Sequence, residues 1–119
     1  MTSPQAVTTA EPAVEAGPGI RVLLYVRAPE GGAAAVERAY HEVSATLAGT
    51  PGLLRNELLR EVSDRDGFAV LSEWESRAAF QAWEEGPSHR GNTSPLRPFK
   101  DRVRGRHYGI YEVTATYRK

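Results

Sequence analysis

The sequence predicts an α+β fold, in which a four-stranded antiparallel sheet carries two helices in the ferredoxin-like order β-α-β-β-α-β. Three observations predict it. The hydrophobic period changes from two residues to about 3.6 within residues 67–89, strand-like runs lie near residue 20 and near the C-terminus, and 119 residues hold one modest core. We expect this ferredoxin-fold domain over residues 20–119, after a flexible tail over residues 1–19 that is rich in Ala, Pro, Thr and Gly.

The first strand and the first helix are expected between residues 20 and 52. Ile20–Val26 is almost wholly apolar, as in a buried strand. Over Glu30–Leu47 the apolar residues fall three and four apart, which predicts a helix with one inner stripe: Ala35, Val36, Ala39, Tyr40, Val43 and Leu47. Gly49, Pro51 and Gly52 then end the helix.

A hairpin is expected next. Leu53–Val62 reads as the second strand, and the Ser-Asp-Arg-Asp-Gly cluster at residues 63–67 forms its turn. In the third strand, successive side chains point to opposite faces. One face carries Phe68, Val70, Ser72 and Trp74, and the other carries Ala69, Leu71 and Glu73.

The last third of the chain is expected to add a helix and a strand. Ser76 is a natural N-cap, and the apolar residues after it fall at helical spacing until Gly86. Tyr108–Tyr117 is rich in β-branched and aromatic residues and predicts a fourth strand. The basic connection before it is long, and Pro95 and Pro98 argue against a continuous helix there. Connections of this kind often act as lids.

Composition excludes several classes of function. Fifteen basic and fifteen acidic residues cancel, which argues against nucleic acid or an acidic membrane surface as partner. Cysteines are absent, so disulfides, thiolate nucleophiles and iron–sulfur clusters are excluded. No apolar run approaches the ~20 residues of a membrane span, and no secretory signal is visible. We expect a cytoplasmic protein that binds a small ligand of low charge.

Motifs for common cofactors are also missing. The sequence contains no dinucleotide-binding glycine motif, phosphate loop, serine elbow or paired-histidine metal motif. Its three histidines, His41, His89 and His107, fall in different predicted elements, so we expect no metal site. Both faces of the first strand are apolar, since Leu24 lies on one side and Leu23 and Tyr25 on the other. One helix layer covers only one of these faces, which predicts a homodimer packed sheet to sheet.

Three segments carry a family resemblance. Pro51–Leu59 (PGLLRNELL), Ser72–Trp83 (SEWESRAAFQAW) and Gly86–Arg90 (GPSHR) are together similar to the antibiotic biosynthesis monooxygenase (ABM) domain, in register over about residues 20–117. The resemblance implies a dimeric α+β barrel of the actinobacterial polyketide-tailoring type. Some members oxidise anthrones to quinones with no metal, flavin or haem, so the expected cofactor is none. The expected partners are a small aromatic substrate and dioxygen.

The resemblance also suggests site residues. Trp74 occupies the tryptophan of the W-E-S motif, which faces the cavity in anthrone-oxidising members, and His89 is the expected base because imidazole titrates near neutrality. Those members commonly carry an asparagine at the position of Val70 and sometimes a tyrosine at that of Phe80. The expected substrate-binding residues are Tyr25, Asn56, Val70, Phe80, Trp83 and Tyr111.

Other functions stay open on the same scaffold. In the haem-degrading branch a histidine ligates the iron, but here that position falls near Asn92 or Thr93, which disfavours haem cleavage. The predicted function is a cofactor-independent monooxygenase that oxidises an aromatic polyketide. The alternatives are a polyketide cyclase or isomerase, in which the same base enolises the substrate, and a non-catalytic protein that binds a hydrophobic metabolite.

Overall fold

A computed structural model describes residues 18–87, 93–101 and 107–118. The elements follow the predicted order with one addition: β1 (Ile20–Arg27), α2 (Ala33–Leu47), β2 (Leu53–Arg60), β3 (Gly67–Trp74), α3 (Arg77–Glu84), the 3-10 helix η1 (Ser94–Phe99) and β4 (Tyr108–Glu112). The predicted tail lies almost wholly outside the described residues. None of the helices within the described ranges has the length and apolar character that a membrane crossing requires.

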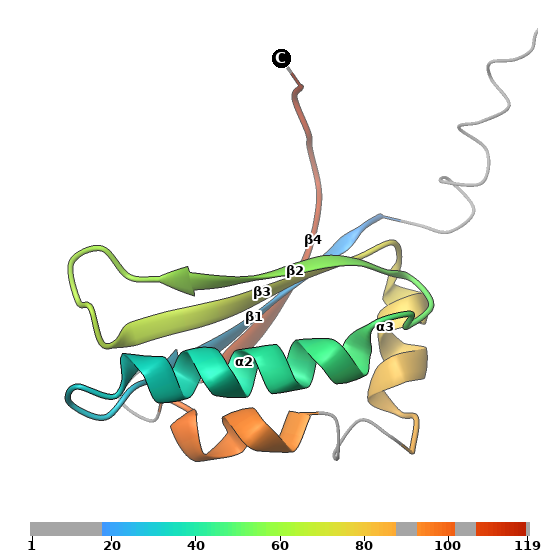
Figure 1. The fold of residues 1–119 in the computed structure, drawn as a ribbon. Coiled ribbons are helices and arrows are strands. Elements are labelled where there is room, and N and C mark those ends of the chain that lie inside the picture. Colours follow the sequence, from blue (N-terminus) through green and yellow to red (C-terminus); the bar gives the residue numbers. More distant parts are fainter. Residues whose placement is uncertain (1–17, 88–92, 102–106, 119) are drawn as a thin grey trace, which may run out of the picture.

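The sheet confirms the ferredoxin-like prediction. Its four strands are antiparallel in the order β2-β3-β1-β4, so the two hairpin strands lie at one side and the two terminal strands at the centre and the other edge. Figure 1 shows α2, α3 and η1 together on one face of the sheet. No described helix covers the opposite face.

Strand alternation divides the sheet into these two faces. In β1 and β3, Leu24 pairs with Val70 and Val22 with Ser72, and these side chains point toward the helices. The intervening positions point away from the helices. We call this second surface the outer face; its apolar members are Leu23, Tyr25, Leu59, Ala69, Leu71 and Tyr111.

The core lies between the sheet and the helices in two clusters. The larger cluster joins Val26 and Phe68 of the sheet to Val36 and Val43 of α2. The smaller cluster consists of Ile20, Trp74 and Phe80, with Trp83 packed against it. Helix α2 begins at Ala33, three residues later than predicted, because Gly31 adopts a left-handed backbone (φ 72°) that a helix does not allow.

The segment before β4 contains a short helix that was not predicted from the sequence. Its prolines do exclude a long α-helix, but Ser94–Phe99 forms a 3-10 helix, in which Pro95 lies within the first turn, where proline is tolerated. Leu96 is buried against α2 and the sheet, so η1 is part of the folded body.

Asp101 anchors the end of this segment. Its backbone N–H donates to the Tyr25 carbonyl (3.0 Å), and its carboxylate, only 1% exposed, lies 3.6 Å from the Arg27 guanidinium. Arg27 also donates to Asp64 in the hairpin turn (2.7 Å). That hydrogen bond, with the charge of Asp101, raises the pKa of Arg27, so the guanidinium stays charged and ties three segments together.

Strand β4 is shorter than predicted. It ends at Glu112, which pairs with Ile20 at the start of β1, and one further bond joins the Val113 N–H to the Gly19 carbonyl (2.9 Å). Beyond this point β1 offers no residue for pairing. Residues 114–118 therefore extend away from the helices (Figure 1), with Tyr117 96% exposed.

Candidate functional site

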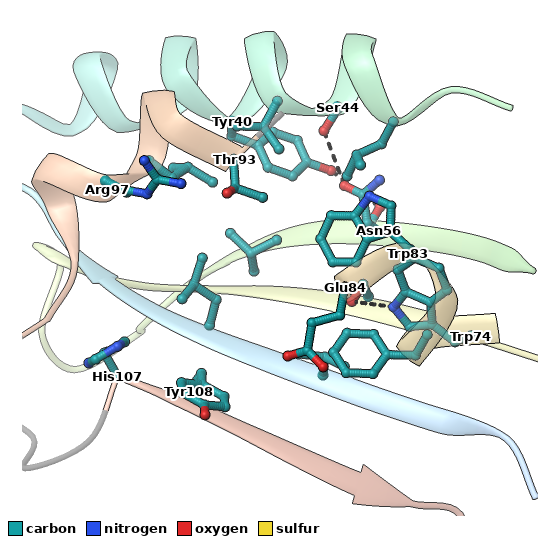
Figure 2. A pocket seen from close by; sticks show the side chains of 18 of the residues that line it. Tyr40, Ser44, Asn56, Trp74, Trp83, Glu84, Thr93, Arg97, His107 and Tyr108 are labelled. Atoms are coloured by element: carbon teal, nitrogen blue, oxygen red, sulfur yellow. Dashed lines mark hydrogen bonds between the residues drawn. The ribbon is translucent and has the colours of Figure 1, made fainter. Parts of the chain in front are cut away.

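A cavity of about 390 Å³ opens between the inner face of the sheet and the helices. Its volume is within the range of small-molecule sites. Its walls come from β1, β2, β3, α2, α3, η1 and the start of β4, as Figure 2 shows for the labelled side chains. A ligand in this cavity would contact nearly every element of the domain.

An aromatic cluster forms one end of the cavity. The ring centroid of Trp74 lies 5.2 Å from that of Trp83 and 5.5 Å from that of Phe80. Trp74 is 1% exposed, although it still lines the cavity. The sequence produces this cluster locally, because the Ser76 hydroxyl accepts the Ala79 N–H (3.1 Å) and starts α3 directly after β3, as predicted. Flat aromatic ligands fit such an end well.

Two hydrogen bonds order the polar part of the floor. The Trp74 indole N–H donates to the Ser72 hydroxyl (2.9 Å), and the Ser44 hydroxyl of α2 donates to the Asn56 side-chain oxygen (3.2 Å); both are dashed in Figure 2. Tyr40 adds a bond from its hydroxyl to the Asn56 backbone carbonyl (3.2 Å). Asn56 and Ser72 are direct partners across β2 and β3.

Basic side chains line another part of the cavity. Arg97 and Lys100 lie three residues apart around η1, and residues at this spacing eclipse each other in a 3-10 helix. Lys100 forms a bridge with Val26, and the carbonyl of His107 accepts the Tyr25 N–H (2.7 Å), so both residues are fixed beside β1. Glu84 of α3 is the acidic residue among the described cavity residues. This wall offers positive charge to an anionic substituent.

The structure places most of the sequence-predicted site residues in this cavity. Five of them line it: Asn56, Val70, Trp74, Phe80 and Trp83. His89 lies outside the described residues, so its proposed role as base stays a prediction. His41 is exposed on α2.

Tyr25 and Tyr111 are corrections. Both lie on the outer face, where Tyr111 pairs with Arg21 and Tyr25 with Ala69, and neither lines the cavity. The reason is the period of the strand: a residue beside Leu24, which faces the helices, must face the other way. We therefore remove both tyrosines from the substrate-binding set.

Several cavity residues were not predicted from the sequence. Tyr40 lies on the predicted inner stripe of α2, and Ser44 lies four residues later, next to Val43 of that stripe. Polar side chains at these positions of the helix were the available signal. Thr93, Arg97 and Lys100 depend on the 3-10 period of η1, which the prolines concealed. His107, which was not among the predicted site residues, also lines the cavity. Within the described part of the chain, no three His, Asp or Glu residues converge in a way that would hold a metal ion.

The chain also matches a model of a known protein family. The family model for antibiotic biosynthesis monooxygenase matches residues 19–91. This chain belongs to that family. The match covers β1 to α3 and therefore includes the aromatic cluster, Asn56 and Ser72.

Two curated relatives are similar to this chain in sequence. The chain is 33% identical over 97 residues to protein SchA of Streptomyces halstedii, covering 82% of this chain but 25% of SchA. It is also 33% identical over 73 residues to the mycobilin-producing haem oxygenase of Mycobacterium tuberculosis, covering 56% of this chain and 70% of that enzyme. The chain thus spans about a quarter of the length of SchA.

Solved structures show the same fold. A mutant of SnoaB, a cofactor-independent oxygenase from Streptomyces nogalater, superposes with a TM-score of 0.72 at 19% identity, covering 87% of this chain and all of SnoaB. A haem-degrading protein from Mycobacterium tuberculosis has a TM-score of 0.65 at 23% identity, covering 87% of this chain and 99% of that protein. At these identities the likeness establishes the fold and leaves the chemistry to the site.

The positions at which the resemblance expects the axial haem ligand carry no histidine. Of the two positions at which the resemblance expects an axial ligand, Asn92 lies outside the described residues, and Thr93 lines the cavity. A threonine hydroxyl is a poor substitute for the imidazole or thiolate that holds haem iron.

Proposed function

We propose that this protein is a cofactor-independent monooxygenase that oxidises an aromatic polyketide, of the anthrone or phenol type, to a quinone. One observation carries the proposal. The cavity combines an end built from Trp74, Phe80 and Trp83, suited to fused aromatic rings, with a small set of polar groups suited to a carbonyl or hydroxyl.

The reaction asks little of the protein, because an activated anthrone supplies most of the reactivity. A base removes a proton from the methylene carbon, and the electron pair of that C–H bond spreads to the carbonyl oxygen. The resulting anion gives one electron to dioxygen, and the radical pair combines to a peroxide anion, which takes the proton back from the base to give a hydroperoxide. Loss of water then yields the quinone, so anthrone plus dioxygen gives quinone plus water. The protein contributes a dry cavity, the base and hydrogen-bond donors.

Two histidines are candidates for the base. His107 lines the described cavity, and its carbonyl is held by the Tyr25 N–H, which fixes its backbone beside β1. His89, the residue favoured from the sequence, follows α3 in the chain. Imidazole suits this step at neutral pH in either case.

We also propose that two copies pack through the outer face. This face carries apolar side chains, with Leu59 and Tyr111 each 41% exposed, and no described helix covers it (Figure 1). Arg21, Arg55 and Glu73 form an ion-pair group on the same face. Residues 114–118 extend from the same domain, and their unpaired backbone could pair with a partner sheet.

A cyclase or isomerase is the second candidate. Val70 and Phe80 both line the cavity at the positions where quinone-forming members carry an asparagine and a tyrosine. An enzyme without those groups still has a base and an enclosed aromatic site, which suffice for enolisation and ring closure.

Oxygen consumption with a model anthrone such as dithranol tests the proposal. Purified metal-free protein is compared with Trp74→Phe, His107→Ala and His89→Ala, and with His41→Ala as the control, since His41 is an exposed histidine outside the cavity. We expect quinone formation above the spontaneous rate, lowered by Trp74→Phe and by one of the two cavity-candidate histidines but not by the control. If the wild type binds dithranol but takes up no oxygen above the spontaneous rate, the oxygenase is rejected and the cyclase or the binding protein is favoured.

A further inference from the structure

Two hydrogen-bond donors, Asn56 and Ser72, lie side by side in the wall of the cavity. Asn56 and Ser72 are cross-strand partners, and both line the cavity. Directly opposed residues of antiparallel strands have Cβ atoms roughly 5 Å apart. Donors at that separation can both reach a single oxygen atom placed between them.

Ser72 is held with its proton available. Its oxygen accepts the Trp74 indole N–H at 2.9 Å. A serine hydroxyl that accepts one hydrogen bond still has its own hydrogen to donate. Among the described residues, no other protein group accepts that hydrogen. Trp74 therefore acts on Ser72 as a positioning residue in addition to forming the aromatic wall.

Asn56 is oriented in the same sense. Its side-chain oxygen accepts the Ser44 hydroxyl (3.2 Å), and its backbone carbonyl accepts the Tyr40 hydroxyl (3.2 Å). Occupying the amide oxygen leaves the NH₂ group as the free end. Among the described residues this NH₂ group has no protein acceptor, and a ligand in the cavity can provide one.

We propose that Asn56 and Ser72 form a donor pair that binds the carbonyl oxygen of the aromatic substrate and stabilises the oxyanion that deprotonation creates. This proposal rests on the function proposed above and names residues that act in it. It also accounts for Val70, which stands where the resemblance expects an asparagine. Here the donors come instead from Ser72 on the same strand and from Asn56 on the neighbouring strand. Donors aimed at developing negative charge are the largest single contribution in many enzymes of this kind.

The ionisation of a bound phenol tests the donor pair without any turnover. 2-Hydroxyanthraquinone is a suitable probe, because its phenolate absorbs at longer wavelength than its phenol. Donors that favour the anion lower the pKa of the bound probe below its value in water. We expect Ser72→Ala and Asn56→Leu each to raise that pKa by about 1 unit relative to the wild-type complex, and each to lower kcat with dithranol by about tenfold, with a smaller effect on KM.

Two further variants guard against simple misfolding. Ser72→Thr keeps the hydroxyl and is expected to retain the wild-type probe pKa. Asn56→Asp keeps the shape but replaces the donor by a carboxylate, and is expected to raise the probe pKa beyond the effect of Asn56→Leu. Thr46→Val removes a hydroxyl on α2 outside the cavity and is the control. Melting temperatures identify any variant that has lost its fold.

The outcomes separate this proposal from the function on which it rests. If the wild type consumes oxygen but Ser72→Ala and Asn56→Asp keep its probe pKa and kcat, the donor pair is rejected while the oxygenase stands. If the probe pKa shifts as expected but the wild type consumes no oxygen, the donor pair is supported and the oxygenase is rejected. A probe pKa that moves equally in the Thr46→Val control would also overturn the donor pair.

Discussion

Replacing Gly52 by alanine is expected to destabilise the domain far more than the same replacement at Gly49. Both glycines adopt the same left-handed backbone, with φ of 82°. A Cβ at Gly49 meets no atom within 4 Å, whereas a Cβ at Gly52 would collide with the Cβ of Ala79 in α3. The carbonyl of Gly52 also accepts the Glu75 N–H (2.8 Å), which holds the loop close to the start of α3.

The two costs follow from these surroundings. An alanine in the left-handed region costs about 1 kcal/mol, and this cost applies at both glycines. Overpacking adds about 2 kcal/mol at Gly52 alone, so we expect losses in the free energy of unfolding of about 1 kcal/mol for Gly49→Ala and about 3 kcal/mol for Gly52→Ala. Ala79→Gly removes the colliding methyl, so the double variant is expected to recover about 2 kcal/mol of coupling energy.

Urea unfolding at fixed chain concentration measures these differences, since dimer formation would make apparent stability depend on concentration. Tryptophan fluorescence follows the transition, because Ala79 and Trp83 both pack against the core cluster that contains Trp74. Equal losses at the two glycines, or a double variant with no coupling, would show that α3 does not pack on the loop as described.

Three other expectations follow from the same contacts. Ser76→Ala removes the N-cap of α3 and is expected to cost about 1 kcal/mol, while Ser76→Asp restores most of it in the same urea assay. Leu71→Lys puts a charge on the outer face and is expected to convert a dimer to monomers in light scattering, whereas Glu37→Lys on exposed α2 leaves the mass unchanged; equal masses for both would refute the interface. Replacing Arg97 and Lys100 together by glutamine is expected to weaken binding of anthraquinone-2-carboxylate about tenfold at low salt, with little effect on uncharged anthraquinone; equal weakening of both ligands in a fluorescence titration would contradict an anion-binding wall.

Local patterns were enough to predict most of the fold. The alternation from Phe68 to Trp74 and the N-cap at Ser76 are each written within a few residues of sequence, and the structure retains both. The resemblance then directed attention to Trp74, whose indole is indeed in the cavity wall.

The remaining features depended on contacts distant in sequence. The alternation in β1 puts Tyr25 and Leu24 on opposite faces of the strand. Both faces are apolar, so only the packing of the helices decides which of them holds the cavity, and the sequence alone could not exclude Tyr25 from the site. Arg97 and Lys100 were missed because a short 3-10 helix containing proline has no pattern of period 3.6. The pairing of Asn56 with Ser72 depends on the register of β2 against β3. A shift of one residue in that register would abolish the pairing, and the sequence does not fix the register to one residue.

The two faces of the sheet give the chain two surfaces that can change separately. In β1 and β3 the even-numbered positions face the helices and the odd-numbered positions form the outer face, so neighbouring residues of one strand serve different surfaces. Evolution, or a directed library, can vary positions such as Val22, Leu24 and Val70 to alter ligand preference while leaving the odd positions and any assembly untouched. Deleting one residue within either strand would instead exchange the two surfaces beyond the deletion and lose both at once.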